Sequence, residues 1–270
     1  MSITLQRGLL VYVGGAVRPS RTSFVAVNGA SPCPRAQMAI RCTCQRHESA
    51  VAYAVGGVAR AIRAPHHGPS RLASTGVDEE WQPKVRAAVP DDAPAMGRVM
   101  VEAWLTAHRG QVPDAAWHKR VNEWTPEVSA QAWARNFAER AQGHHPRDVL
   151  LVAEDDADDL IAVVFGMEAD DDSSGSVAEV AVLYVLPDRQ RQGIGRLLLM
   201  EAGKELTTLG FTRLHISVLT ANLPARSFYE AMGGQEIGQR TIDEEGYLLP
   251  GTVYGWTDIA ALASDVRQSS

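Results

Sequence analysis

A glycine-rich turn between an apolar strand and an apolar helical stretch is the segment of this sequence best suited to chemistry. The turn follows Pro187, which cannot continue a sheet ladder, and carries Gln190, Gly193 and Gly195. Glycine lets the backbone approach a ligand closely. A helix N-terminus presents N–H groups without intrahelical acceptors, together with the positive end of the helix dipole. The segment therefore predicts a site that holds phosphate.

Two other glycine-rich phosphate-binding motifs are excluded, each by one residue of this sequence. A dinucleotide-binding fingerprint needs a small residue three positions after its second glycine, where this chain has Leu198. A nucleoside-triphosphate loop needs Gly-Lys followed by Ser or Thr, but Gly203-Lys204 is followed by Glu205 inside the helix. The remaining spacing, Gln-x-x-Gly-x-Gly, resembles the pyrophosphate loop of the GNAT acetyltransferase superfamily. An ordinary strand–turn–helix connection is the alternative that so short a pattern leaves open.

A second segment resembles the same family. Residues 213–219 predict a short strand, and residues 222–234 predict a helix closed by glycine. The spacing Asn-x-x-Ala-x-x-Phe-Tyr-x-x-x-Gly in the second range is similar to the other hallmark segment of GNAT enzymes. With both patterns in the expected order, the resemblance covers about residues 84–260.

The resemblance implies an α/β fold with a mixed, mostly antiparallel central sheet flanked by helices. The periodicity of the chain predicts the element order β, α(α), β, β, β, α, β, α, β, β, in which the first helix starts at residues 91–94 with an aspartate as its N-cap. One apolar face of that helix is predicted to consist of Met96, Val99, Met100, Ala103 and Trp104. The other predicted elements are a strand at 84–89, one or two helices in 105–145, a hairpin of 149–153 and 159–166, a strand at 177–186, and strands at 235–242 and 252–258.

The charge of the chain changes sign near residue 77. Residues 1–77 contain nine Arg, no Lys and a single acid, Glu48, which gives +8; the other 193 residues carry 17 basic and 31 acidic groups, which gives −14 and the total of −6. We expect a basic, disordered extension at 1–82, a GNAT-like domain at 83–262 and a tail at 263–270. The acidic domain disfavours a nucleic-acid partner and suits a cationic amine.

The extension leaves other interpretations open. An organelle transit segment and a secretory signal are both compatible with an Arg-rich, acid-poor start. Cys33, Cys42 and Cys44 could bind zinc together with His47, although free thiols fit their spacing better, and we expect no metal site. No apolar run reaches the 18 residues of a membrane span, so we expect a cytoplasmic protein without a membrane partner.

The resemblance implies acetyl-CoA as co-substrate, with its pyrophosphate held at the glycine-rich turn by backbone N–H groups and one basic side chain. The residues at the matching positions are Gln190, Arg191, Gln192, Gly193, Gly195 and Arg196.

The resemblance also implies that the pantetheine arm pairs like an extra strand with Leu183, Tyr184 and Val185. We expect Pro187 to help part this strand from the next one, with a simple strand end as the alternative. Asn222 either bonds the arm or only caps its helix.

Two side chains are expected to carry the proton transfers. Many members of the family place a tyrosine at the position of Tyr229 to protonate the thiolate leaving group; packing beside Phe228 is the alternative. Glu179 opens the strand before the turn and is expected to be the base that takes the amine proton, unless it is an edge residue facing solvent. His215, on the next strand, fits a structural histidine better than a base.

Three residues at the end of the first predicted helix are candidates for the acceptor pocket: Trp104, His108 and Arg109. Core packing and surface positions are the alternatives for them.

The function that follows is an acetyl-CoA-dependent N-acetyltransferase acting on a primary amine. Because residues 83–262 contain no cysteine, we expect direct transfer in a ternary complex. A catalytically silent acyl-CoA-binding module is the alternative. The sequence leaves open whether the acceptor is a small molecule or a peptide, and whether the protein is a homodimer.

Overall fold

A computed structural model of the chain describes residues 81–170 and 172–264. The expected extension, apart from its last two residues, and the expected zinc-binding residues Cys33, Cys42, Cys44 and His47 lie outside the described residues. So does the expected tail after Ser264. No helix within the described residues combines the length and the apolar content that a membrane crossing requires.

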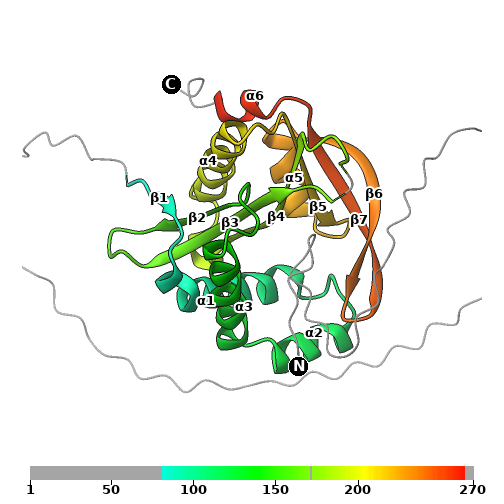
Figure 1. Cartoon of the computed structure of the whole chain (residues 1–270). Coiled ribbons are helices and arrows are strands. Elements are labelled where there is room, and N and C mark those ends of the chain that lie inside the picture. Colours follow the sequence, from blue (N-terminus) through cyan, green and yellow to red (C-terminus); the bar gives the residue numbers. More distant parts are fainter. Residues whose placement is uncertain (1–80, 171, 265–270) are drawn as a thin grey trace, which may run out of the picture. The chain divides into compact units, whose positions relative to one another are not determined.

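The described elements follow the predicted order and add one short helix at the end (Figure 1). The region predicted to hold one or two helices holds two. The elements are β1 (Lys84–Ala87), the 3-10 helix η1 (Pro90–Asp92), α1 (Ala93–His108), α2 (Asp114–Glu123), α3 (Pro126–Ala141), β2 (Val149–Glu154), β3 (Leu160–Glu168), β4 (Val177–Val185), the 3-10 helix η2 (Pro187–Arg189), α4 (Ile194–Thr208), β5 (Arg213–Leu219), α5 (Leu223–Ala231), β6 (Gln235–Glu244), β7 (Tyr247–Trp256) and α6 (Ile259–Ser264).

Seven strands within the described residues form one sheet in the order β1-β2-β3-β4-β5-β7-β6. Its neighbours are antiparallel except for β4 and β5, which are parallel. This topology confirms the expected mixed, mostly antiparallel sheet.

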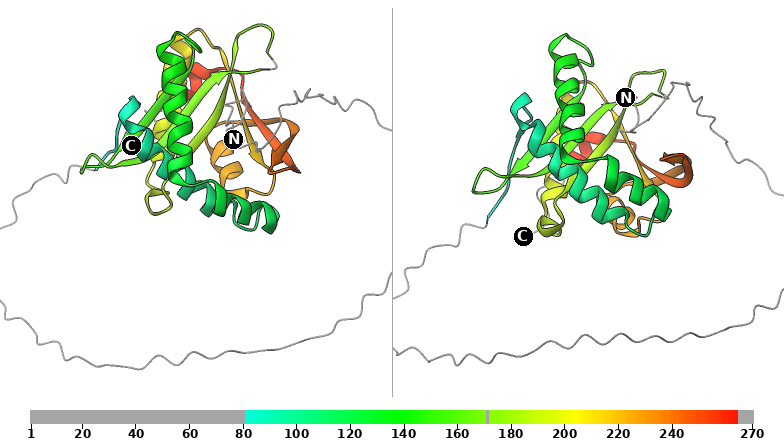
Figure 2. Two further views of the ribbon diagram at one scale, coloured as in Figure 1. Left: turned by 60° about the horizontal axis from the view of Figure 1, so that its bottom comes forward. Right: turned by 90° about the horizontal axis from the view of Figure 1, so that it is seen from below.

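Helices cover both faces of the central strands (Figures 1 and 2). On β3, Phe165 packs edge-on against Trp133 of α3, with ring centroids 5.9 Å apart. The next residue, Gly166, faces Leu206 of α4, so that an added Cβ would lie 3.1 Å from that side chain. Neighbouring residues of a strand point to opposite faces, and both of these faces are covered. Strands β2 and β3 are therefore buried along almost their whole length.

Helix α1 buries the apolar face that the periodicity predicted, since all five of its residues belong to the core. At Gly97 the helix approaches α3 so closely that an added Cβ would lie 2.4 Å from the carbonyl oxygen of Pro126. Asp92 occupies the N-cap position, but its side chain makes no capping hydrogen bond to α1. Its carboxylate binds Arg86 and accepts the N–H of Val89 instead. The prediction was right about the cap position and wrong about how the aspartate is used.

Strands β4 and β5 pair over only three residues and then part. Their paired residues are 177–179 and 213–215. On the other edge of β4, Val182 pairs with Phe165 and Val180 with Gly166, so Ala181 is an extra, bulged residue. A bulge bends its strand and strengthens the local twist. The strands have thus separated before Pro187, which lies in η2, so the prediction that this proline helps to part them was wrong about the position.

Candidate functional site

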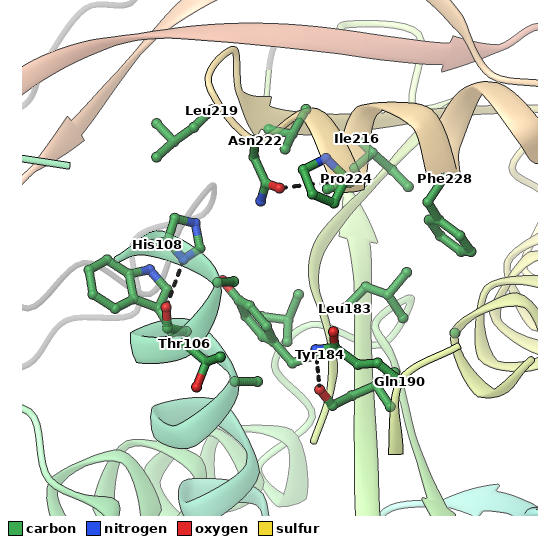
Figure 3. A pocket seen from close by; sticks show the side chains of 18 of the residues that line it. Thr106, His108, Leu183, Tyr184, Gln190, Ile216, Leu219, Asn222, Pro224 and Phe228 are labelled. Carbon is green, nitrogen blue, oxygen red and sulfur yellow. Dashed lines mark hydrogen bonds between the residues drawn. The ribbon is translucent and has the colours of Figure 1, made fainter. Parts of the chain in front are cut away.

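The parting of β4 and β5 opens into a cavity of about 530 Å³. Side chains from α1, β4, β5 and α5 surround it (Figure 3). We call the part at the glycine-rich turn the loop end. We call the part between α1, α2 and β6 the α1–α2 end. The loop end is lined by Arg189, Gln190, Arg191, Gly193, Ile194, Gly195 and Arg196, and the α1–α2 end by Trp104, His108, Gln111, Arg120, Trp124, Tyr184, Ile242 and Glu244.

The loop end is the N-terminus of α4. Gly193 is its N-cap with φ +80°, a left-handed conformation that favours glycine. Among the described residues, no atom lies within 4 Å of a Cβ added there, so the backbone conformation and not space requires glycine. The helical hydrogen bonds begin with the Leu197 N–H, which donates to Gly193 O. The N–H groups of the first turn before Leu197 therefore have no intrahelical acceptor and can bind an anion.

The side chains of the turn hold its own backbone. Gln190 donates from Nε2 to the carbonyl of Val185 at 3.0 Å, and Gln192 donates to the carbonyl of Asp188 at 3.3 Å. Of the six predicted pyrophosphate residues, Gln192 alone does not line the cavity. The glutamine of the motif thus ties the turn to the end of β4.

The residues predicted to lie along the pantetheine arm all line the cavity: Leu183, Tyr184 and Val185. They lie on the part of β4 that no longer pairs with β5. Across the cavity, Asn222 caps α5, with its Oδ1 accepting from Ala225 N at 3.2 Å, while the residue also lines the cavity (Figure 3). Its capping role is confirmed, and its contact with the arm stays a prediction.

Tyr229 lines the cavity from α5 and is buried. Its ring packs against Phe228, Tyr254 and Trp256, at centroid distances of 5.4, 5.9 and 6.4 Å. Burial raises the pKa of its phenol well above the ordinary value. The phenol therefore keeps its proton at neutral pH and can donate it.

Glu179 is buried at the start of β4, so the alternative of a solvent-facing edge residue is wrong. Its Oε1 accepts from Nη1 of Arg240 at 2.9 Å and lies 3.5 Å from Oγ of Ser217. Ser217 lines the cavity, whereas Glu179 does not. The carboxylate therefore reaches the cavity through the serine. His215 is its register partner on β5.

His108 and Trp104 stack at the C-terminal end of α1, with ring centroids 4.6 Å apart. Nδ1 of the imidazole lies 3.0 Å from Trp104 O. This nitrogen must donate the hydrogen bond, because a carbonyl oxygen only accepts. Burial lowers the pKa of His108 to about 4, and the charge of Arg120 contributes to this shift. Arg109 lies outside the cavity lining, with its guanidinium 5.5 Å from the ring centre of Trp117.

A buried ion-pair cluster at the α1–α2 end was missed by the sequence analysis. Arg120 of α2 lies 3.0 Å from a carboxylate oxygen of Glu244 and 3.0 Å from one of Glu245, which also binds Lys119. Burial raises the pKa of Glu244, although Arg120 opposes the shift. The cluster ties α2 to the β6–β7 hairpin. One signal could have found it: Arg120 lies four residues after Ala116, on the buried side of α2.

The guanidinium of Arg120 lies over two tryptophan rings, 5.1 Å from the ring centre of Trp104 and 5.2 Å from that of Trp124. The cation is therefore held by aromatic faces as well as by carboxylates. Within the described residues, no group of three or more His, Cys, Asp and Glu side chains could hold a metal ion.

Comparisons with known proteins found the following similarities. Residues 114–234 match the sequence model of the Acetyltransferase (GNAT) family. The uncharacterized N-acetyltransferase YuaI of Bacillus subtilis is 25% identical over 178 residues, which are 66% of this chain and 95% of that protein. The mycothiol acetyltransferase of Actinosynnema mirum is 28% identical over 164 residues, which are 61% of this chain and only 54% of that protein. The crystal structure of the PaiA N-acetyltransferase of Thermoplasma acidophilum in complex with coenzyme A has a TM-score of 0.48 at 20% identity, and the match covers 63% of this chain and 98% of that chain.

Proposed function

Residues 114–234 belong to the GNAT acetyltransferase family, and on this premise we propose that the protein is an acetyl-CoA-dependent N-acetyltransferase. It transfers the acetyl group to a primary amine directly, within a ternary complex. The acceptor is a small molecule or a peptide.

The observation that carries the proposal is the parting of β4 and β5 beside the N-terminus of α4. The unpaired edge of β4 offers backbone N–H and C=O groups to the amides of a pantetheine arm, as a neighbouring strand would. The first turn of α4 offers N–H groups and a positive dipole end to the pyrophosphate. One extended ligand that carries both amides and phosphates fits both features.

Tyr229 is the proposed general acid. The amine lone pair attacks the thioester carbonyl carbon, a C–N bond forms, and the C–S bond breaks with its electron pair going to sulfur. The phenol gives its proton to the departing thiolate, which leaves coenzyme A as the free thiol. The buried, protonated phenol in the cavity wall supports this assignment.

Glu179 is the proposed base. An ammonium cannot attack a carbonyl, so the acceptor must lose a proton to become a nucleophile. Ser217 lines the cavity with its Oγ 3.5 Å from Glu179 Oε1, and it can pass that proton to the carboxylate, directly or from a bound water. The assignment rests on this connection, because Glu179 itself does not line the cavity.

Trp104 and His108 are proposed to contact the acceptor. They reach the cavity from α1, on a different element from those that form the loop end. The acceptor can therefore bind while the cofactor occupies the groove between β4 and β5, as a ternary complex requires.

A thiol-release assay on the purified full-length chain tests the proposal. Acetyl-CoA is incubated with a panel of primary amines, and calorimetry measures cofactor binding in parallel. We expect amine-dependent release of coenzyme A and mass-spectrometric detection of the acetylated amine. Binding without release for every amine would instead support a silent acyl-CoA-binding module, and absent binding would overturn both functions.

A further inference from the structure

The imidazole of His108 can only accept a hydrogen bond from a ligand in the cavity. Its Nδ1–H is committed to the carbonyl of Trp104, so the lone pair lies on Nε2. Burial keeps the ring neutral at physiological pH, because it lowers the pKa to about 4. The neutral His108 ring therefore has no second N–H that it could donate to a ligand.

Gln111 offers a second acceptor in the same lining. Its Nε2 donates to the carbonyl of Ala107 at 2.7 Å. Its Oε1 is buried and has no hydrogen-bond partner among the described residues. A buried carbonyl oxygen without a donor is unfavourable, and a ligand N–H would satisfy it.

Glu244 adds a carboxylate to these two acceptors. It lines the cavity from the end of β6 and binds the Arg120 guanidinium through one oxygen. A carboxylate has lone pairs for more than one donor, so a ligand cation can share it with Arg120.

Arg120, the only cation in the lining of this end of the described cavity, already pairs with two carboxylates. Two carboxylates lie within 3.0 Å of its guanidinium, and tryptophan rings lie on its faces. Arg120 Nε makes no hydrogen bond among the described residues, but a ligand carboxylate placed there would lie beside Glu244 and Glu245, and like charges in a buried site repel one another. The site therefore disfavours an acceptor that carries a carboxylate.

From these contacts we propose that the α1–α2 end selects acceptors with a second, cationic amino group, as in a small aliphatic diamine. One amine faces the thioester, and the other donates to Glu244, Gln111 and His108 between the walls of Trp104, Trp124 and Tyr184. The net charge of −14 after residue 77 favours the same ligand class. The inference rests on the proposed function.

Calorimetric titration tests the proposal without turnover. Putrescine, butylamine and γ-aminobutyrate share a four-carbon chain and differ in whether the second end is a cation, a methyl group or a carboxylate. Each is titrated into the full-length protein saturated with coenzyme A. We expect putrescine to bind at least about tenfold more tightly than butylamine, as a hydrogen-bonded charge allows. We expect γ-aminobutyrate to bind most weakly.

Equal affinities, or tighter binding of γ-aminobutyrate, would overturn the inference. Because the ligands are titrated without acetyl-CoA, a protein that discriminates among them but releases no thiol in the assay above would refute only the proposed function.

Two variants locate the selectivity. Glu244→Gln and Gln111→Leu should each lower putrescine affinity about tenfold and leave butylamine within about twofold. Gln111→Leu keeps the Arg120 cluster intact, so its result does not depend on tolerance of a change in that buried network. The matched control is Glu236→Gln, which removes an acid on the same strand that binds Arg226 outside the cavity. Unchanged putrescine selectivity in both folded variants would refute the assignment.

Discussion

The two ends of the cavity are built from different parts of the polypeptide. At the loop end, the lining residues come from the single segment 189–196, whose backbone forms the N-terminus of α4. At the α1–α2 end, the lining side chains come from α1, α2, β4 and β6 and, outside these elements, from Gln111 and Trp124. Ion pairs between α2 and the β6–β7 hairpin bring these elements together. A backbone site depends on local conformation, whereas a side-chain site depends on packing between distant elements. Changes at one end should therefore leave the other end working.

The largest effect is expected at the loop end. Gly193→Asp should abolish acetyl-CoA binding in calorimetry, with a rise in Kd of at least about a thousandfold. The carboxylate would lie close to the pyrophosphate, and a left-handed non-glycine residue adds about 1–2 kcal/mol of strain. Gly193→Ala, which adds only the strain, is the matched control and should keep measurable binding. Near-normal affinity in the aspartate variant would show that the pyrophosphate lies elsewhere.

The next largest effect is expected at the α1–α2 end, on stability. Arg120→Met should lower the free energy of unfolding by about 3–5 kcal/mol in urea denaturation, because it leaves two buried carboxylates with only Lys119. Adding Glu244→Leu should recover part of this loss. Acetyl-CoA affinity should stay near the wild-type value wherever the variant is folded. A loss below about 1 kcal/mol would mean that the pairs are solvated in solution.

This difference also explains which part of the site the sequence could reveal. The glycine spacing and the Asn222–Tyr229 segment are local patterns, and they predicted the turn, α5 and five of the seven residues that line the loop end. Gln192 was predicted there but does not line the cavity, and Arg189 and Ile194 line it without having been predicted. Glu244 was missed because the second-to-last strand was expected to end at residue 242. An Asp-Glu-Glu-Gly run after an isoleucine is typical of a turn. Glu244 at the end of that strand pairs with Arg120, which lies 124 residues earlier in the chain. The local sequence does not reveal this pairing, so it did not predict that the end of the strand is buried.

The parting of β4 and β5 was expected for the wrong reason. The sequence offered Pro187 as a visible strand breaker, but the bulge at Ala181 lies in an unbroken apolar run. Nothing in such a run marks the residue that will lose its partner, because a bulge is set by the register of two neighbouring strands. The order of elements and the buried face of α1 were predictable since each depends on one periodic segment.

Between the two ends, Tyr229 should control chemistry without controlling cofactor binding. Tyr229→Phe should lower kcat about 10²-fold or more and leave the Kd of acetyl-CoA nearly unchanged, since the phenol is needed only when the thiolate leaves. Tyr254→Phe is the matched control, because this hydroxyl binds Glu230 and Arg226 instead of lining the cavity. Unchanged turnover in the Tyr229 variant would remove it from the role of acid.

His108 should make the α1–α2 end sensitive to acid. Its pKa falls from 6.5 to about 4 on folding, so the unfolded chain binds more protons between these values. Its contribution to stability is therefore present above pH 6.5 and is lost as the pH falls toward 4, by at most about 3 kcal/mol. His108→Phe, which keeps a ring against Trp104, should flatten the stability profile in that window. A profile as steep as that of the wild type would assign the acid sensitivity to other groups.

The smallest effect should come from Gly97, which sets the distance between α1 and α3 and so the position of the α1–α2 end. Gly97→Ala places a Cβ 2.4 Å from the Pro126 carbonyl oxygen, a backbone atom that cannot rotate away, so α1 must shift. Overpacking of this kind lowers the free energy of unfolding by about 1–3 kcal/mol. Because α1 carries Trp104 and His108, the KM of the acceptor should rise while the Kd of acetyl-CoA stays constant. Gly203→Ala in α4 is the matched control, since its Cβ would make only ordinary contacts and alanine favours the helix by up to about 1 kcal/mol. If Gly97→Ala weakened cofactor binding as much as it weakened acceptor binding, the two ends would be coupled through α1 and would not be separate sites.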